Sequence, residues 1–261
     1  MKIIVQNLAV EYQDEGAGSP RQSLRRSAGK VILLLHGWQD NLHTFDALTK
    51  FLSETNRVIR LDLPGFGQSE TPKETWGLDN YVEFVKNFIQ KLNLQVDAFV
   101  GHSFGGRIAI KGAAENNLKP AKIILINSAG IAKSKTLRNY ILKIFAKIGS
   151  FITYIPPFVF WREKLRQKIY KFIGSDYLDA HEMQKTFLKI ISEDLSENAK
   201  KINTPTLLIW GANDTETPLS DGKLLSRLIS HSKLEIINEA GHFVHQEKPE
   251  EVTKLIQEFL C

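Results

Sequence analysis

Short apolar runs alternate with helical patterns along the sequence, and this alternation constrains the fold more than any other feature. An unbroken apolar run of this length is typical of a strand buried on both faces. The runs are residues 31–35, 57–61, 96–101, 122–127, 204–210 and 233–238. Apolar residues at helical spacing lie between them, at 43–54, 79–92, 104–117, 220–230 and 248–260. The pattern predicts an α/β fold with a mostly parallel, doubly wound sheet.

The N-terminal part predicts a hairpin followed by a loop. Residues 2–12 (KIIVQNLAVEY) predict two short strands joined at Gln6–Asn7. Residues 13–30 are polar, contain several Gly and Ser and carry a basic cluster, which predicts a mobile loop. The N-terminus lacks the apolar block of a secretory signal, and no apolar run reaches the roughly 20 residues that span a bilayer. We therefore expect a soluble, cytoplasmic protein.

The alternation fails once, between residues 131 and 202, where helical patterns occur without a convincing strand. Because βα units flank this segment, we predict a helical cap (131–202) inserted between two parts of one core (1–130 and 203–261). An insertion at this place lies over the carboxyl ends of the strands, where open α/β sheets bind ligands.

The basic charge of the chain is concentrated in this predicted cap. The formal net charge is +5, yet residues 131–173 carry ten Lys or Arg and one acidic residue, Glu163, which leaves −4 for the rest. Such local basicity argues against a protein that coats nucleic acid. The favoured interpretation is an amphipathic lid, and three others stay open: a docking surface for an acidic protein partner, a membrane-surface contact and the binding of anionic small substrates.

Residues 99–107 (FVGHSFGGR) join an apolar strand directly to a helix. In this context G-x-S-x-G predicts a sharp turn that projects Ser103 above the sheet as a nucleophile. Gly101 and Gly105 are expected because a Cβ there would clash with the neighbouring helix or strand. The alternative is a serine that only caps the helix, which leaves the two glycines without a reason.

A serine hydroxyl needs a base, and the sequence offers seven histidines. His242 follows the last apolar run and precedes the last helix, so its loop reaches the same edge of the sheet as Ser103. His245 is the local competitor. We expect His36 and His102 to be packed neighbours, and the surface to hold the remaining histidines, His43, His181 and His231.

The histidine in turn needs an acid that fixes its tautomer and stabilises the imidazolium. Asp214 follows a buried run within WGANDTETP and precedes His242 in the chain. Glu216 and Asp221 are alternatives that lie further from the strand end. A plain turn aspartate near Pro218 also stays open.

Attack on a carbonyl puts negative charge on its oxygen, which two backbone N–H groups should receive. Phe104, directly after Ser103, should supply one. The loop HGWQDN after the first apolar run should supply the other from Trp38, although HGW is also consistent with a simple tight turn.

Five motifs stand in a characteristic order: LLLHGW, RLDLPGFGQSE, GHSFGG, WGANDTETP and AGHFVHQEKPEEV. Together they resemble the α/β-hydrolase fold proteins of the single-cap type, whose triad residues follow the chain order Ser, Asp, His. The resemblance covers nearly all of the chain outside the 13–30 loop and the cap. It implies neither an organic cofactor nor a metal.

Departures from individual subfamilies narrow the expected activity. Serine at position 103 argues against haloalkane dehalogenases and epoxide hydrolases, which place aspartate there. Meta-cleavage carbon–carbon hydrolases often have Asn before the serine and Trp after the histidine, whereas this chain has His102 and Phe243. NSAG (127–130) is nevertheless similar to them. His102 makes the chain look more like carboxylesterases and lipases.

The sequence thus predicts a serine esterase acting through Ser103, His242 and Asp214 on a small-molecule ester with a short-to-medium acyl or aromatic group. Alternatives are a carbon–carbon bond hydrolase, an acyl-carrier-protein ester hydrolase and a non-catalytic receptor. Besides Trp38 and Phe104, four aromatic residues are expected to line the substrate pocket: Trp76, Phe151, Trp161 and Phe243.

Overall fold

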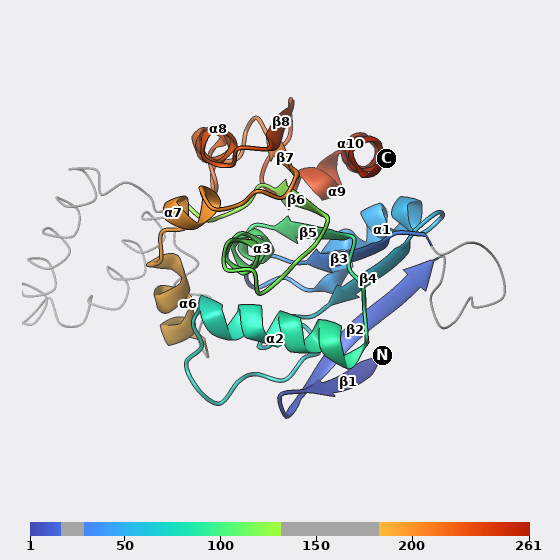
Figure 1. The fold of residues 1–261 in the computed structure, drawn as a ribbon, viewed down its shortest axis with the longest axis vertical. Coiled ribbons are helices and arrows are strands. Elements are labelled where there is room, and N and C mark those ends of the chain that lie inside the picture. Colours follow the sequence, from blue (N-terminus) through green and yellow to red (C-terminus); the bar gives the residue numbers. More distant parts are fainter. Residues whose placement is uncertain (17–28, 132–182) are drawn as a thin grey trace, which may run out of the picture.

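The computed structural model describes residues 1–16, 29–131 and 183–261 (Figure 1). Its strands are β1 (Lys2–Val5), β2 (Leu8–Gly16), β3 (Val31–Leu35), β4 (Arg57–Leu61), β5 (Ala98–His102), β6 (Lys122–Ile126), β7 (Thr206–Gly211) and β8 (Ser232–Ile237). They form one sheet in the order β1-β2-β4-β3-β5-β6-β7-β8. The strands from β4 to β8 run parallel, and β1 and β2 pair antiparallel at one edge. This confirms the predicted α/β fold.

Helices cover both faces of the sheet. The helices are η1 (Leu42–Phe45), α1 (Asp46–Leu52), α2 (Leu78–Lys91), α3 (Phe104–Ala114), α6 (Gln184–Ile191), α7 (Ser196–Ala199), α8 (Leu219–Leu228), α9 (Val244–Glu247) and α10 (Pro249–Leu260). Helices α2, α3 and α8 cover one face, and α1, α9 and α10 cover the other (Figure 1). The sheet is therefore doubly wound, as predicted.

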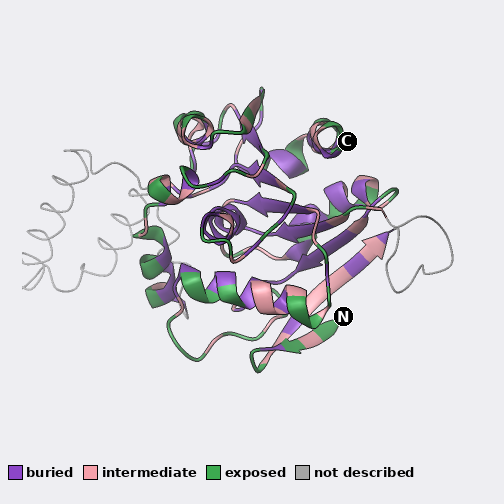
Figure 2. Cartoon of the chain, in the orientation of Figure 1, coloured by how far each residue is buried: buried purple, intermediate pink, exposed green. Residues whose placement is uncertain are grey.

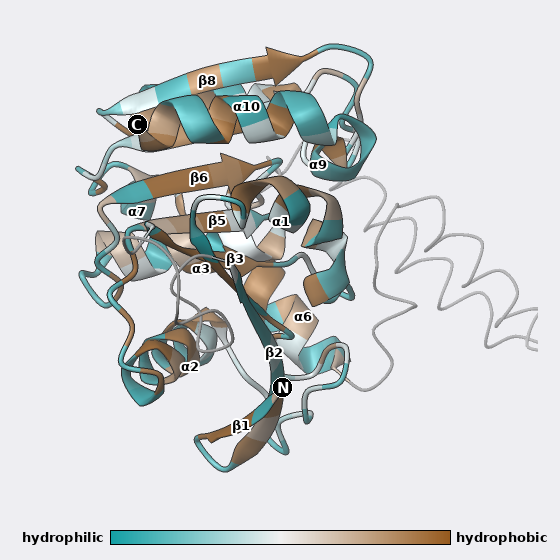
Figure 3. Cartoon of the chain, turned by 90° about the vertical axis from the view of Figure 1, so that its right-hand side faces the viewer, coloured by the Kyte–Doolittle hydropathy of each residue, from teal (hydrophilic) through white to brown (hydrophobic). Residues whose placement is uncertain are grey.

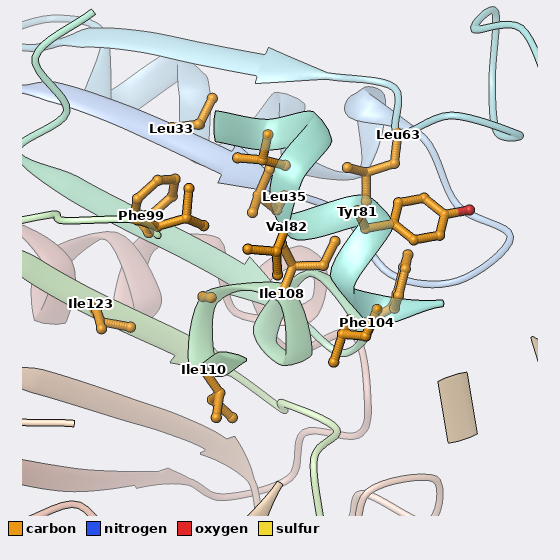
Figure 4. Packing of buried hydrophobic residues seen from close by; sticks show 14 of the residues in the cluster. Leu33, Leu35, Leu63, Tyr81, Val82, Phe99, Phe104, Ile108, Ile110 and Ile123 are labelled. Carbon is orange, nitrogen blue, oxygen red and sulfur yellow. The ribbon is translucent and has the colours of Figure 1, made fainter. Parts of the chain in front are cut away.

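The core is divided by the sheet into two apolar layers, and β3 illustrates why its run is continuous. Successive side chains of a strand point to opposite faces. Leu33 and Leu35 pack in the layer under α2 and α3, whereas Ile32 and Leu34 pack in the layer under α1 and α10. Figure 4 shows Leu33 and Leu35 in the first layer, near α2 and α3. A strand covered on both sides needs apolar residues at every position.

Burial follows the same arrangement. The central strands are buried along their length, and exposed residues gather on the outer sides of the helices (Figure 2). Helix α10 shows alternating hydrophobic and hydrophilic patches, whereas β6 is mostly hydrophobic (Figure 3). An apolar stripe on one side of a helix is what lets it cover a sheet and face water with the rest.

The structure corrects two predictions about strands. Residues 13–16 belong to β2 rather than to a loop, because Arg57 and Arg60 of the adjacent β4 pair with their polar side chains. The β8 strand, at an edge of the sheet, is not buried on both faces: of its residues only Ile237 is buried, and Ile236 is 42% exposed. The rest of the predicted loop, residues 17–28, lies outside the described residues.

The predicted cap is described only at its C-terminal end. Residues 183–202 contain α6 and α7, which pack against α3, and no strand is found in them. Residues 132–182, with all ten Lys and Arg of the predicted basic cluster, lie outside the described residues. Among the helices the structure does describe, none combines the length and apolar character that crossing a bilayer requires.

Candidate active site

The predicted site residues follow different strands but meet at the carboxyl edge of the sheet. Ser103 stands directly between β5 and α3, with φ 48° and ψ −107°. Its N–H donates to the carbonyl of Ile126 at 3.2 Å, and its carbonyl accepts from the N–H groups of Gly106 and Ala129. An L-residue with this positive φ is strained, and the surrounding hydrogen bonds hold it in place.

Two glycines make this turn sterically feasible, as the sequence predicts. A Cβ added to Gly101 would lie 2.6 Å from the backbone nitrogen of Gly106, in the first turn of α3. A Cβ added to Gly105 would lie 2.0 Å from the carbonyl oxygen of Leu35, in the adjacent β3. Helix α3 therefore approaches the sheet more closely than any side chain at these positions permits.

His242 and Asp214 lie in contact, although 27 residues separate them in the chain. Nδ1 of His242 is 2.8 Å from Oδ2 of Asp214, and both side chains are buried. An ionised carboxylate only accepts hydrogen bonds, so Nδ1 carries the proton and Nε2 is left free to accept one. This is the arrangement in which a histidine serves as a general base.

Asp214 is held from several sides at once. Its Oδ1 accepts from the backbone N–H groups of Glu216 (2.8 Å) and Thr217 (3.0 Å), and its Oδ2 accepts from the Thr217 hydroxyl at 2.7 Å. Burial by itself raises the pKa of Asp214, but hydrogen bonds from His242, Asn127 and Thr217 outweigh it and hold the pKa below its ordinary value of 3.8. Asp214 thus both holds its own turn together and supports His242. The two interpretations offered for it, a turn aspartate and the acid beside the histidine, therefore apply at once.

Asn127, which the sequence reasoning did not single out, is part of this arrangement. It follows β6, is fully buried and has φ 42°. Its Nδ2 donates to Oδ2 of Asp214 and to the carbonyl of Gly241 (3.3 Å), and its Oδ1 accepts from Gly211 N–H at 3.3 Å. A polar residue directly after a buried strand at this edge was the signal that could have identified it.

The alternatives for base and acid lie elsewhere. His245 is fully buried in α9, where its Nε2 lies 3.0 Å from the Thr44 hydroxyl of η1. Burial, reinforced by His242, lowers the pKa of His245 to about 3. Glu216 approaches the opposite nitrogen of His242, with Oε2 at 3.5 Å from Nε2, so it does not occupy the position of the supporting acid. Asp221 lies in the first turn of α8.

His102 and His36 are buried neighbours, as expected. Nε2 of His102 donates to the carbonyl of His242 at 3.0 Å, and burial lowers the pKa of His102 well below 6.5. Nε2 of His36 accepts from Leu63 N–H at 2.8 Å, which leaves its Nδ1 to donate to the carbonyl of Gly37. Both rings are therefore neutral and link the loops around Ser103.

The loop after β3 lies next to Ser103. A Cβ added to Gly37 would be 3.5 Å from the Cβ of Ser103, which measures how closely the two segments approach. Among the described residues, the N–H groups of Trp38 and Phe104 donate no hydrogen bond to a protein acceptor. These two predicted oxyanion donors are thus available to a ligand.

An aromatic cluster extends from these two donors. Trp38 packs against Phe104 (ring centroids 5.4 Å apart), Phe66 (4.8 Å) and Phe187 of α6 (5.1 Å). Tyr81 of α2 packs edge-on against Phe104 at 4.9 Å. The sequence analysis did not assign Phe66 and Phe187 to this cluster, because nothing in the spacing of the motifs indicates that either residue packs against Trp38.

The other residues predicted to contact substrate lie in different surroundings. Phe243 is 38% exposed and packs edge-on against the ring of His242 at 5.4 Å. The ring of Trp76 packs against Tyr81, with centroids 5.0 Å apart, and Tyr81 lies between it and Phe104. Phe151 and Trp161 lie outside the described residues.

Left-handed backbone recurs along this edge of the sheet. After β3, β5, β6 and β8 respectively, φ is 54° at Gln39, 48° at Ser103, 42° at Asn127 and 55° at Glu239.

Within residues 1–16, 29–131 and 183–261, no group of three or more His, Cys, Asp or Glu side chains is arranged as a metal site.

Comparison with known proteins agrees with this architecture. A family model described as the alpha/beta hydrolase family matches residues 32–255. An uncharacterized hydrolase of Bacillus subtilis, YugF, is 27% identical, over 88% of this chain and 90% of its own. Monoacylglycerol lipase ABHD6 of Homo sapiens is also 27% identical, over 88% of this chain and 75% of its own.

Two solved structures show the same fold. A membrane phospholipase A, described as a bacterial virulence factor, has a TM-score of 0.74 and 25% identity and covers 100% of this chain and 84% of its own. An esterase from Thermogutta terrifontis has a TM-score of 0.72 and 23% identity and covers 100% of this chain and 97% of its own.

Proposed function

The chain belongs to the alpha/beta hydrolase family and is a hydrolase, and from that premise we propose that it cleaves carboxylic esters with Ser103 as the nucleophile. In this proposal His242 is the general base and Asp214 the acid that orients it. The observation that carries the proposal is the 2.8 Å bond from His242 Nδ1 to Asp214 Oδ2, at the edge where Ser103 is held in a strained turn.

The reaction proceeds in two halves. Nε2 of His242 takes the proton of the Ser103 hydroxyl as Oγ attacks the ester carbonyl, and the same nitrogen then protonates the departing alcohol. Water, deprotonated by His242, releases the acid from the acyl-enzyme. The Asp214 carboxylate stabilises the imidazolium in both halves, and its depressed pKa keeps it ionised at neutral pH.

The oxyanion forms beside the N–H groups of Trp38 and Phe104. Each donor of this kind contributes about 2.7–4 kcal/mol to the transition state. The rings around them form an apolar wall, which suits an acyl chain or an aromatic acid better than a polar group. The monoacylglycerol lipases among the relatives add a concrete ester to test.

The test combines turnover with active-site labelling. We expect the wild type to turn over p-nitrophenyl esters or monoacylglycerols, and Ser103→Ala to lose at least about 10³-fold in kcat. A fluorophosphonate probe should label the wild type and not Ser103→Ala. Ser192→Ala, on the surface after α6, is the matched control and should behave as wild type. Absence of both turnover and labelling in the wild type would contradict the proposal.

A further inference from the structure

We propose that Glu216 selects the leaving alcohol of the ester: it favours alcohols that carry hydroxyl groups or a positive charge and disfavours anionic ones. This inference rests on the proposed ester hydrolysis and specifies the half of the substrate that leaves first.

The position of Glu216 relative to His242 is the first argument. Oε2 of Glu216 lies 3.5 Å from Nε2 of His242, the nitrogen that protonates the leaving oxygen. A donor and the atom it protonates lie about 2.6–3.2 Å apart during transfer. Substituents one or two bonds beyond the leaving oxygen therefore come within reach of this carboxylate.

The backbone under Glu216 is fixed by the same turn that holds Asp214. Glu216 N–H donates to Oδ1 of Asp214 at 2.8 Å, and the next residue, Thr217, donates to the same oxygen at 3.0 Å. The carbonyl of Thr217 accepts from the indole of the buried Trp210 at 2.8 Å. Glu216 therefore starts from a rigid support, although its side chain is 56% exposed.

The carboxylate is available to a substrate. Among the described residues it forms no ion pair other than the contact with His242. An exposed glutamate can change rotamer when a ligand enters, so the alcohol can displace it from Nε2 and still contact it. A carboxylate accepts hydrogen bonds from hydroxyl groups and attracts cations, whereas it repels a second anion.

The two sides of the site thus differ in chemistry. The acyl side is bordered by the apolar rings of Trp38, Phe104 and Phe187. The alcohol side is bordered by a charged carboxylate at Glu216. An apolar acyl group joined to a polyol or to a cationic alcohol matches both sides, and an ester whose alcohol carries a carboxylate matches only the first.

The test uses octanoate esters that differ only in the alcohol: glycerol, ethanol, choline and glycolate. Wild type should prefer octanoylglycerol and octanoylcholine to the glycolate ester. Glu216→Gln should raise kcat/KM for the glycolate ester roughly fivefold relative to ethyl octanoate and lower that for octanoylcholine by a similar factor. Because the side chain is half exposed, dissolved salt should screen its charge. In roughly 0.5 M salt, where charges are screened within a few ångströms, these ratios should therefore shrink toward one. Glu258→Gln, on α10 with a side chain 61% exposed, is the matched control.

The outcomes separate the two proposals. Equal changes for all four esters in Glu216→Gln, or no change in their order, would overturn the role of Glu216 and leave ester hydrolysis standing. No turnover of any ester by the wild type would overturn both. A change in charge preference that disappears with salt, with an unaltered ethyl ester, supports the proposal.

Discussion

The ring of His102 donates a hydrogen bond from Nε2 to the backbone carbonyl of His242, 3.0 Å away. The residue that precedes the proposed nucleophile thus holds the residue proposed as its base. Burial lowers the pKa of His102, the neighbouring imidazoles of His245 and His242 oppose a second positive charge there, and the ring therefore stays neutral. A neutral ring with its proton on Nε2 gives this contact a fixed direction.

His102 is therefore expected to position His242 rather than to take part in proton transfer. We predict that His102→Leu lowers kcat roughly 10–100-fold with little change in KM, since small displacements of reacting groups cost about that much. His102→Gln retains an N–H donor and should recover part of the loss. Steady-state kinetics on a neutral ester, with folding checked by thermal unfolding, tests this. A His102→Leu enzyme with kcat within twofold of wild type would contradict it.

Gly105 gives a prediction about stability. The Cβ of Gly105→Ala would meet the carbonyl oxygen of Leu35 at 2.0 Å, and the backbone of a central strand cannot move aside. We expect a loss of about 3 kcal/mol or more in the free energy of unfolding.

Gly112→Ala on the same helix is the control for this substitution. Its Cβ would meet Cδ1 of the buried Leu118 at 2.4 Å and its Cγ at 2.6 Å, so a side chain rather than a strand backbone has to shift, and alanine gains about 1 kcal/mol in helix propensity. We expect Gly112→Ala to lose at least about 1 kcal/mol less than Gly105→Ala, because a side chain yields more easily than a strand backbone and the gain in helix propensity offsets part of the crowding. Urea unfolding of both variants decides the matter, and equal losses would show that close approach to Leu35 is not the constraint.

Asp214 should be indispensable for fast turnover. Asp214→Asn removes the charge that supports the imidazolium and leaves an amide that can impose the wrong tautomer on His242. We expect kcat to fall roughly 10⁴-fold, the loss known when the acid of a Ser-His-Asp triad is neutralised in this way. Asp221→Asn should stay within twofold of wild type. The reverse ranking of the two variants would assign the supporting acid to Asp221.

Buried His245 predicts how stability depends on pH. Its pKa is about 3 in the folded protein, against an ordinary value of 6.5, so below pH 6.5 the unfolded chain binds a proton that the folded one does not. Folding therefore loses stability as pH falls, by up to about 1.4 kcal/mol per pH unit for this residue. His245→Gln should flatten the profile between pH 6.5 and 4.5, and His231→Gln on the surface should not. Parallel profiles for wild type and His245→Gln would refute this.

The fold was predictable where local patterns carry the information. Every residue of β3 is apolar because both of its faces are covered, and this is visible in five consecutive letters of the sequence. The extension of β2 was not predictable in this way. Asp14 and Glu15 look like loop residues until Arg57 and Arg60, more than 40 residues away, are seen to pair with them.

The same distinction applies to the site. The proposed nucleophile, base and acid follow from motifs that stand next to strand ends, and His242 does lie against Asp214. Asn127 was missed because its importance depends on three partners that are distant in the sequence: Gly211 at the end of β7, Asp214 after it and Gly241 after β8. Phe187 was missed because its contact with Trp38 depends on how α6 packs, which no local spacing records.

The left-handed residues at the strand ends have a consequence for how this protein could be evolved in the laboratory. Gln39, Ser103, Asn127 and Glu239 each hold a conformation that costs an L-residue about 1 kcal/mol or more. A selection for heat resistance alone would accept glycine at several of these positions, whereas a selection that also demands turnover would reject it at Ser103 and Asn127. The rim of the sheet is therefore where thermostability and activity compete, and stabilising changes that spare activity should be sought in the two apolar layers or on the outer helices.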